Sequence, residues 1–472
     1  MIADNLHSRK FSPIQILSTL ILFAALLFYI ISIAASGKSS VVTSVIVVLG
    51  MLLNGGIAVF FIVADVRGIS LAKAHWYFVL IFLCIAPLAQ YSTGYYAWNY
   101  KLPTNTMIAA NGIITLWCIF FACVYSFVIR NKRGKEQVGI KSYARFTELP
   151  SSMFFDVALV IFSLLIFIYL VNRYGFTEMA SQRVSYGTLA TSWADWIMSY
   201  ALPAVPALGC CHCLLLAKEK HMWFVPALVL FIITLFCVNP IYSSRYSVSA
   251  AYLPILLALL PKNALRNRSF DVVILVAVII VFPMMNAFKT MTIDQVTFGY
   301  LFDNFAGSYR SIDFDAYSMI VRSLQYVDSF GLSMGAQLMS SLFYGLPSMA
   351  AKVNVATGEL VSGTQGASYT NLSAPLQAEA YVDFGVIGVI VYAILFALIF
   401  GLLDYSFWSK SKNTFSSFRT IVFFVLVAFS FYLMRGALQP VIFRMWTLLL
   451  PLGLLYLGCR LQSFARSKRL HP

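Results

Sequence analysis

Charged residues are scarce in this chain of 472 residues: Asp, Glu, Lys and Arg together make up only 11%, whereas hydrophobic residues make up 60% and the mean hydropathy is +0.82. Apolar stretches recur at the length that a bilayer requires, about 20 residues. This composition excludes a water-soluble globule. The sequence therefore predicts an all-α polytopic membrane protein.

A sliding window of about 19 residues predicts the membrane spans. Twelve spans are expected, near residues 14–35, 41–64, 76–92, 107–129, 153–171, 195–217, 222–238, 246–260, 271–288, 384–404, 418–434 and 440–460. The first is expected to remain as a helix, because its apolar run is too long for a signal peptide. The chain is thus expected to divide into residues 1–288 with nine spans, 289–383 as a long loop, and 384–472 with three spans and a tail.

Acidic residues are outnumbered, 18 against 33 Lys and Arg, which gives a net charge of +15. Of these basic residues, 22 fall in the gaps on the same side as the two termini. The positive-inside rule therefore makes both termini cytoplasmic and puts the long loop on the outer side. The basic residues lie in short loops with no folded domain to present them, so nothing supports nucleic-acid binding.

Cysteine and histidine give no sign of a metal centre. The eight cysteines all fall inside or at the ends of predicted spans, which excludes a disulfide framework in an outer loop. Cys210, Cys211, His212 and Cys213 have the residue types of a zinc site. However, adjacent residues of a helix point about 100° apart and cannot converge on one ion. Buried free thiols are the preferred interpretation.

The long loop is too apolar to be disordered and is expected to fold onto the membrane surface. Residues 311–330 predict an amphipathic helix, with Asp315, Ser318 and Arg322 on its polar face. Residues 336–344 predict a second, shorter interfacial helix. Residues 361–373, rich in Gly, Ser, Thr and Asn, predict a mobile lid between these helices and the membrane.

Asp313 and Asp315 form a D-x-D pattern at the start of the first of these helices. Some glycosyltransferases hold a nucleotide-bound metal with this spacing. Aspartate is also the expected capping residue at a helix start and a favourable charge for the helix dipole. Capping is favoured here over metal binding, and a catalytic use stays open.

Arginines and lysines also occur on the outer side, several of them at helix ends. An arginine beside an apolar helix end is costly unless it snorkels, pairs with an acid or faces a polar cavity. Six such residues, contributed by several gaps, favour a shared anion site over scattered anchors: Arg183, Arg245, Lys289, Arg310, Arg435 and Arg444. Guanidinium binds phosphate oxygens through a planar fork, so a lipid pyrophosphate headgroup is the expected ligand.

Several segments resemble a known family of enzymes. They are NRYGFTEMASQRVSYG (172–187), YSSRYSVSAAYL (242–253), AFKT (287–290), the pair Tyr309–Arg310, the run at 373–401 and MRGALQPVIFRMWTL (434–448). Together, and in this order, they resemble the Wzy-type polymerases that join oligosaccharide repeat units of bacterial O-antigen and related surface polysaccharides.

That resemblance implies a GT-C-like glycosyltransferase of the bacterial inner membrane, with its active site facing the periplasm. It would join undecaprenyl-pyrophosphate-linked repeat units without a cofactor or metal, beside a chain-length-regulating co-polymerase. The six basic residues above become candidates for binding the pyrophosphate and glycan. A base for the acceptor hydroxyl must be a carboxylate. Glu379 is preferred, Asp313, Asp315 and Asp383 are the other candidates, and pairing of Glu379 with an arginine is the structural alternative.

Two other functions compete with this one. An O-antigen ligase would share the architecture, but that family relies on a histidine in the long loop. None of the five histidines lies there: His7, His75, His212, His221 and His471. A flippase or transporter would be expected to show related halves and polar residues at the midplane, and neither is visible.

Overall fold

The computed structural model describes residues 40–65, 67–99, 102–137, 153–181, 197–218, 220–240, 245–261, 305–343, 356–362, 372–408 and 417–470, together with residues 243, 264–265, 274–276 and 299. Over these residues the regular structure is helical, apart from an isolated antiparallel bridge between Ser373 and Gly436. The prediction of an all-α membrane protein is confirmed at this level.

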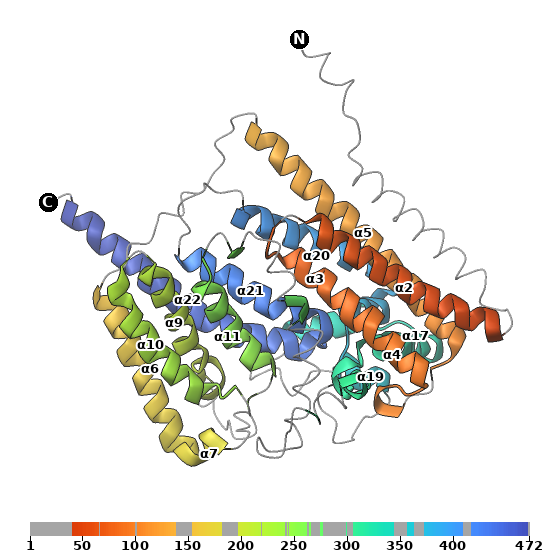
Figure 1. Cartoon of the computed structure of the whole chain (residues 1–472), viewed down its shortest axis with the longest axis horizontal. Coiled ribbons are helices and arrows are strands. Elements are labelled where there is room, and N and C mark those ends of the chain that lie inside the picture. Colours follow the sequence, from red (N-terminus) through yellow and green to blue (C-terminus); the bar gives the residue numbers. More distant parts are fainter. Residues whose placement is uncertain are drawn as a thin grey trace, which may run out of the picture.

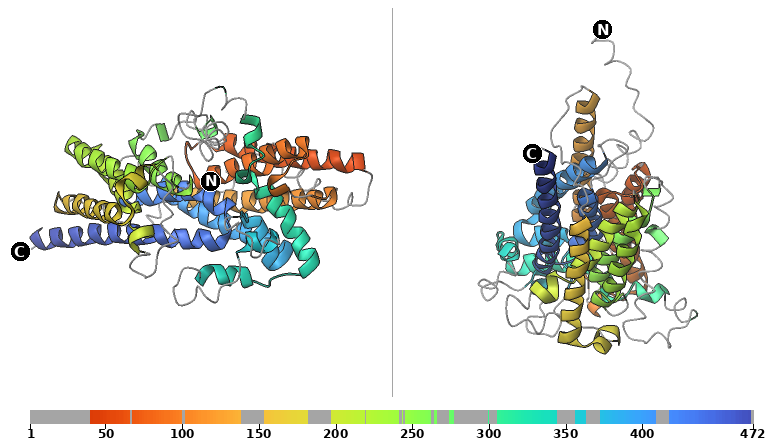
Figure 2. Two further views of the ribbon diagram at one scale, coloured as in Figure 1. Left: turned by 90° about the horizontal axis from the view of Figure 1, so that it is seen from below. Right: turned by 90° about the vertical axis from the view of Figure 1, so that its left-hand side faces the viewer.

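The helices form two groups joined by a central pair (Figure 1). The first group contains α2 (Ser40–Ala64), α3 (Leu71–Leu80), α4 (Ala86–Thr93), α5 (Thr104–Gln137) and α20 (Leu376–Trp408). The second contains α6 (Met153–Tyr174), α9 (Ala204–Ala217), α10 (Phe224–Cys237) and α11 (Arg245–Leu259). The central pair is α21 (Ser417–Arg435) and α22 (Leu438–Leu470). In Figure 2, left, the yellow and green helices of the second group again lie apart from the red and orange helices of the first.

Shorter helices complete the described chain. They are the π-helix η1 (Ile81–Ile85), η2 (Ala97–Asn99), α7 (Phe176–Ser181), η3 (Ile197–Ala201), η4 (His221–Trp223), α16 (Phe305–Ser308), η8 (Ile312–Phe314), α17 (Ala316–Phe330), α18 (Ala336–Phe343) and α19 (Thr357–Ser362).

Seven stretches are long and apolar enough to cross a membrane among the residues described: Val42–Ala64, Leu71–Thr93, Thr104–Asn131, Asp156–Tyr174, Leu376–Trp408, Phe418–Arg435 and Leu438–Gly458. Three shorter apolar helices, Ala204–Ala217, His221–Cys237 and Ser247–Leu259, match three more predicted spans. The predicted spans at 14–35 and 271–288 lie outside the described residues, apart from 274–276. The total of twelve therefore stays a prediction.

The second described span begins earlier than the sequence predicts. Ser70 has an extended backbone and its hydroxyl accepts from Lys73 N at 3.0 Å, which caps α3 at Leu71 instead of near residue 76. Lys73, expected in a cytoplasmic loop, is therefore inside the helix and only 1% exposed. The span ends at Gly94, whose φ of 67° closes the last turn.

A break divides α20 into two parts. Gly385 has φ 62° and ψ −147°, a conformation that only glycine adopts without strain. At Gly388 an added Cβ would lie 2.1 Å from the carbonyl oxygen of Ala380, so the two parts touch. The break falls where the sequence starts its span at 384. The first part carries the two candidate carboxylates Glu379 and Asp383.

The amphipathic helix expected over 311–330 is present as α17, and several residues of its polar side are buried. Ser318, Ser323 and Asp315 are buried together with its apolar side. The helix packs against α5, α20 and α19, and Arg322 donates to Ser362 O of α19 at 3.3 Å. Neighbouring helices, not water, therefore cover its polar face. The second expected helix is confirmed as α18, while most of the predicted lid lies outside the described residues.

Thiol labelling tests the predicted topology. Cysteine at Gly363 is expected to react with a membrane-impermeant reagent in intact cells and cysteine at Gly134 only after lysis, because the charge count puts 134 with the termini. Cys123 is the exposed native thiol in the described residues and is changed to Ser in the parent, which measures the background. Labelling at 134 but not at 363 in intact cells would show that the chain has the opposite orientation to the one predicted.

Candidate functional site

A buried carboxylate, Asp315, lies where three distant segments meet. Its side chain accepts hydrogen bonds from the Ser373 hydroxyl and from Trp98 Nε1, the latter at 3.1 Å. Arg435 Nη2 forms an ion pair with Asp315 Oδ1 at 3.3 Å. The isolated bridge between Ser373 and Gly436 holds two of these segments together. Three distant segments, η2, the segment before α20 and the end of α21, thus meet at the start of α17 in one polar centre.

The expected capping role of Asp315 is wrong. It directly precedes α17, but its backbone is already helical, with φ −79° and ψ −6°, and its side chain makes no capping hydrogen bond. The carboxylate is engaged instead by Trp98, Ser373 and Arg435, none of which is near it in sequence. Asp313 is also buried, within the single turn η8. No group of three potential metal ligands occurs among the described residues.

Arg435 and Arg444 lie on either side of the turn between α21 and α22. Arg435 also donates to Ile312 O at 3.1 Å, and its Nε is a buried donor with no hydrogen-bond partner among the described residues. The Arg444 guanidinium stands over the Tyr432 ring, 5.8 Å from its centre. Tyr432 is one turn before Arg435 on α21.

The loop that carries Arg310, Asp313 and Asp315 is fixed to the end of α4. Gln90 Nε2 donates to Tyr309 O and to Phe314 O, both at 3.0 Å. The Phe314 ring stacks on Phe82 with a centroid distance of 5.2 Å. Arg310 is half-buried in this loop, and the bond from Arg435 to Ile312 O ties the same loop to the end of α21.

The structure describes only part of the set of basic residues that the sequence predicts to converge. The structure relates Arg435, Arg444 and the loop of Arg310 to one another. Arg183 and Lys289 lie outside the described residues, and of Arg245 only the backbone is described, as the first residue of α11. The joint site of all six residues stays a prediction.

Glu379 is fully buried on the other side of the same turn. Its Oε1 accepts from Leu438 N at 2.7 Å, and its Oε2 accepts from the Thr357 hydroxyl at 2.5 Å. Both described contacts are with neutral groups, so they do not include the arginine pairing weighed as an alternative. The turn from Arg435 to Leu438 therefore contacts Asp315 through its first residue and Glu379 through its last.

Asp383 has a structural role. Its two carboxylate oxygens accept from Gln337 N at 3.1 Å and Leu338 N at 2.9 Å, which caps the first turn of α18. Backbone donors occupy both oxygens of Asp383, whereas Glu379 has one backbone donor and one hydroxyl donor, so Glu379 stays the preferred candidate for a base, with Asp313 and Asp315 as the others.

Several buried polar atoms near these residues lack hydrogen-bond partners in the described part of the chain. They are Gln90 Oε1, Gln377 Oε1, the Tyr392 hydroxyl and Arg435 Nε. Buried polar groups are normally satisfied, so such atoms mark a place for water or a polar ligand. Gln90 holds the loop before α17, and Gln377 lies two residues before Glu379. We call the region of Asp315, Arg435, Arg444 and Glu379 the arginine-turn site.

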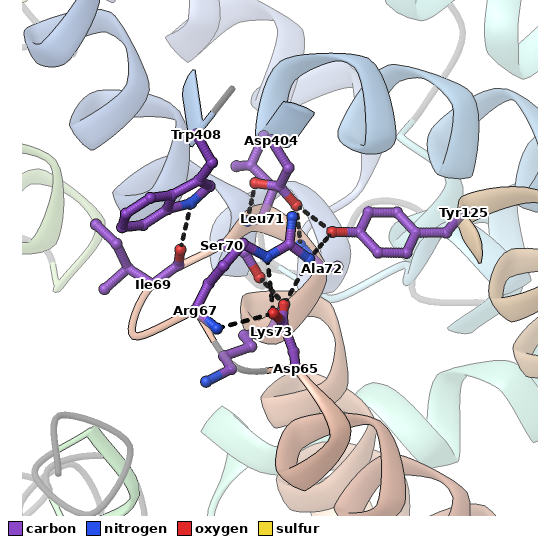
Figure 3. Close-up of polar contacts among 10 residues, drawn as sticks. All are labelled: Asp65, Arg67, Ile69, Ser70, Leu71, Ala72, Lys73, Tyr125, Asp404 and Trp408. Carbon is purple, nitrogen blue, oxygen red and sulfur yellow. Dashed lines mark hydrogen bonds and ion pairs between the residues drawn. The ribbon is translucent and has the colours of Figure 1, made fainter. Parts of the chain in front are cut away.

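A second polar cluster lies at the opposite ends of α3, α5 and α20 (Figure 3). Asp404 Oδ1 accepts from Leu71 N at 2.8 Å and Oδ2 from Ala72 N at 3.2 Å. The Tyr125 hydroxyl donates to Asp404 Oδ2 at 2.8 Å and accepts from Arg67. Arg67 forms a two-pronged ion pair with Asp65, with both N···O distances at 2.7 Å. Sequence reasoning missed this cluster, because it treated Arg67 only as a loop charge.

The second cluster satisfies its own hydrogen-bonding groups, whereas Arg435 Nε of the arginine-turn site has no partner among the described residues. Ser70 and Arg67 N supply further donors to Asp65, and no buried polar side-chain atom of Asp65, Arg67, Tyr125 or Asp404 lacks a partner. Burial alone would raise the pKa of Asp65, but the hydrogen bonds and charge of Arg67 lower it below its ordinary value. We therefore interpret this cluster as a structural clamp between helices, and the arginine-turn site as the candidate functional site.

Comparison with known proteins gave no match, whether to family models, to curated proteins or to solved structures.

Proposed function

We propose that the chain is a polymerase that joins undecaprenyl-pyrophosphate-linked oligosaccharide repeat units into O-antigen or a related surface polysaccharide. The observation that carries this proposal is the turn between α21 and α22. Its first residue, Arg435, pairs with the buried Asp315, its last residue, Leu438, donates to the buried Glu379, and Arg444 follows on α22 over the Tyr432 ring. The resemblance of the sequence motifs gives the substrate class. Guanidinium suits a pyrophosphate, and a carboxylate suits an acceptor hydroxyl.

The proposed reaction is glycosyl transfer. The acceptor hydroxyl oxygen forms a bond to the anomeric carbon of the growing glycan, and the bond from that carbon to the pyrophosphate oxygen breaks. The leaving undecaprenyl pyrophosphate keeps the bonding electrons, and Arg435 and Arg444 stabilise the charge that develops on it. The acceptor proton passes to a carboxylate, for which Glu379 is the first candidate. The reaction requires no cofactor, nucleotide sugar or ATP.

The proposed setting is the bacterial inner membrane, with cytoplasmic termini and the arginine-turn site facing the periplasm. A GT-C-like architecture and a chain-length-regulating co-polymerase belong to the same proposal. Two alternatives remain, an O-antigen ligase and a lipid-linked oligosaccharide flippase. Against the ligase stands the missing histidine in residues 289–383. The flippase is disfavoured because the arginine-turn site is built from helix ends and the turns between them, whereas a transporter would be expected to hold polar residues at the membrane midplane.

Reconstitution tests the function directly. The full chain is placed in liposomes with a purified undecaprenyl-pyrophosphate-linked repeat unit as the only substrate, and products are separated by size. A polymerase gives elongated lipid-linked chains without ATP or nucleotide sugar. Transfer to added lipid A core without elongation would identify a ligase, and movement across the bilayer without elongation would identify a flippase.

Elongation is expected to continue in EDTA. The arginines supply the positive charge that a metal provides in many phosphoryl and glycosyl transfers, and Asp315 is held by protein donors. Rates are compared in buffer, in EDTA and in EDTA followed by excess magnesium or manganese. Abolition by the chelator with recovery on metal addition would return Asp313 and Asp315 to a metal-binding role.

Glu379→Gln is expected to lower the rate of elongation by about 100-fold or more, the usual contribution of a positioned general base. Glutamine has nearly the same shape, and its carbonyl oxygen can still accept from Leu438 N, so the fold is expected to survive. Thr357→Ala is the matched control, since it removes the neutral hydroxyl contact to Glu379, together with the longer contact to Gln337, and keeps the carboxylate. Normal elongation by correctly folded Glu379→Gln would exclude Glu379 as the base.

A further inference from the structure

The segment Phe330–Phe343, which joins α17 to α18 and includes α18, exposes apolar side chains on the outside of the fold. Phe330 is 77% exposed and Met334 76%, and Met339 and Leu342 are about half exposed. These fourteen residues include no charged side chain. A patch of this kind on a protein surface marks an interaction with another apolar phase.

Helix α18 has the reverse of the polarity that water-facing helices show. Its buried side chains are polar: Gln337 and Ser341 face the protein, and Gln337 Oε1 accepts from the Thr357 hydroxyl at 3.4 Å. Its exposed side chains are the apolar Met339 and Leu342, three positions apart on one face. Such a helix is favourable only where its outer face meets hydrocarbon.

The segment is held in a defined position. Asp383 caps the first turn of α18, Ser333 N donates to Val382 O at 2.9 Å, and Gln439 Nε2 donates to Ser340 Oγ at 3.2 Å. Phe384 packs against Gly335, so the segment rests directly on the break in α20. The exposed side chains are therefore a fixed surface of the fold.

The apolar surface continues into a stripe along α20. Below the break, large apolar side chains are exposed at nearly every fourth residue: Ile387, Val391, Leu395, Ile399 and Leu402. This spacing defines one face of a candidate membrane span, the face that meets lipid. Leu332, which lies beside Gly385, and Phe384 connect the stripe to the segment without a polar interruption.

We propose that Phe330–Phe343 is immersed in the acyl chains of the bilayer and forms a membrane-embedded flange on the outer end of α20. The sequence pattern alone places α18 at the membrane surface, whereas its reversed polarity requires hydrocarbon contact. The occupant of this surface is bulk lipid, because the patch is continuous with the lipid-facing stripe. The proposal concerns membrane contact only and is independent of the proposed enzyme activity.

Spin-label accessibility tests the flange. The full-length Cys123→Ser chain carries a nitroxide at Met339→Cys, and the chain is reconstituted in lipid nanodiscs. Leu395→Cys on the stripe is the lipid-facing control, and Glu178→Cys on α7, an exposed charged position, is the water-facing control. Relaxation by oxygen, which concentrates in acyl chains, is compared with relaxation by a water-soluble nickel chelate.

The label at 339 is expected to respond as the label at 395 does, with strong oxygen and weak nickel relaxation. A response like that at 178 would place the segment in water and overturn the proposal. Protection from both reagents would mean that protein covers the patch, and a dipolar distance between two labels in one nanodisc would identify a second copy. Either result would overturn the lipid assignment.

Discussion

Replacing Arg435 with alanine is expected to lower polymer formation by about 10- to 100-fold, because it removes a charge-assisted contact of about 1.5 to 3 kcal/mol that strengthens in the transition state. Arg435 is the guanidinium with the clearest place in the site: it reaches Asp315 and Ile312 O, and its Nε has no described partner. Lysine should rescue only partly, since a point charge does not reproduce the planar fork. Polymer length profiles at matched membrane levels give the measurement.

Asp315→Asn separates a binding role of Arg435 from a structural one. The single amide oxygen of asparagine can still accept from Trp98 Nε1 and Ser373 N, and its NH2 can donate to the Ser373 hydroxyl, but the side chain no longer pairs as an anion with Arg435. If Arg435 binds the substrate pyrophosphate, the carboxylate competes for it, so Asp315→Asn should keep activity and lower KM. If Arg435→Ala and Asp315→Asn lower polymer formation equally, the contact between Arg435 and Asp315 is a structural ion pair and Arg435 does not bind the substrate. Arg130→Ala, at the exposed opposite end of α5, is the control and should be neutral.

The apolar spans could be predicted from the sequence because hydropathy acts over a window and needs no knowledge of neighbours. Ten of the twelve expected spans overlap described helices, and the span at 384–404 begins where Gly385 breaks α20. The start of α3 was missed by five residues, because Lys73 argues against a span by composition. The N-cap of α3 by Ser70 is a local contact and the burial of Lys73 is an effect of packing, and a hydropathy window registers neither.

The candidate site was predictable only residue by residue. Charge at helix ends identified Arg435 and Arg444, and the position before a helix identified Glu379. The partners of these residues come from elsewhere in the chain: Asp315 meets Trp98, 217 residues away, and Glu379 meets Leu438, 59 residues away. No local pattern marks Trp98, Ser373 or Thr357 for these contacts. The capping prediction for Asp315 failed for the same reason, since local propensity yielded to tertiary partners.

Asp404 is the centre of the structural clamp, which joins α3, α5 and α20 at the ends away from the arginine-turn site. Asp404 satisfies two backbone donors at the start of α3 and the Tyr125 hydroxyl of α5, and it is itself fully buried on α20. Three segments from distant parts of the chain therefore depend on one carboxylate. Trp408 Nε1, which donates to Ile69 O at 3.0 Å, adds a contact between the same elements.

Asp404→Ala is expected to lower the free energy of unfolding by about 3 kcal/mol or more, because it leaves three buried donors, Leu71 N, Ala72 N and the Tyr125 hydroxyl, without their acceptor. Tyr125→Phe removes one hydroxyl and should cost only about 1 kcal/mol. Reversible unfolding in mixed micelles at pH 7 measures both.

The lowered pKa of Asp65 means that its ion pair with Arg67 stabilises the fold at neutral pH and that this contribution is lost as the pH falls through the folded-state pKa of Asp65. If Asp404→Ala unfolds like the parent chain, the cluster does not clamp the helices, and its closed network must be explained in another way.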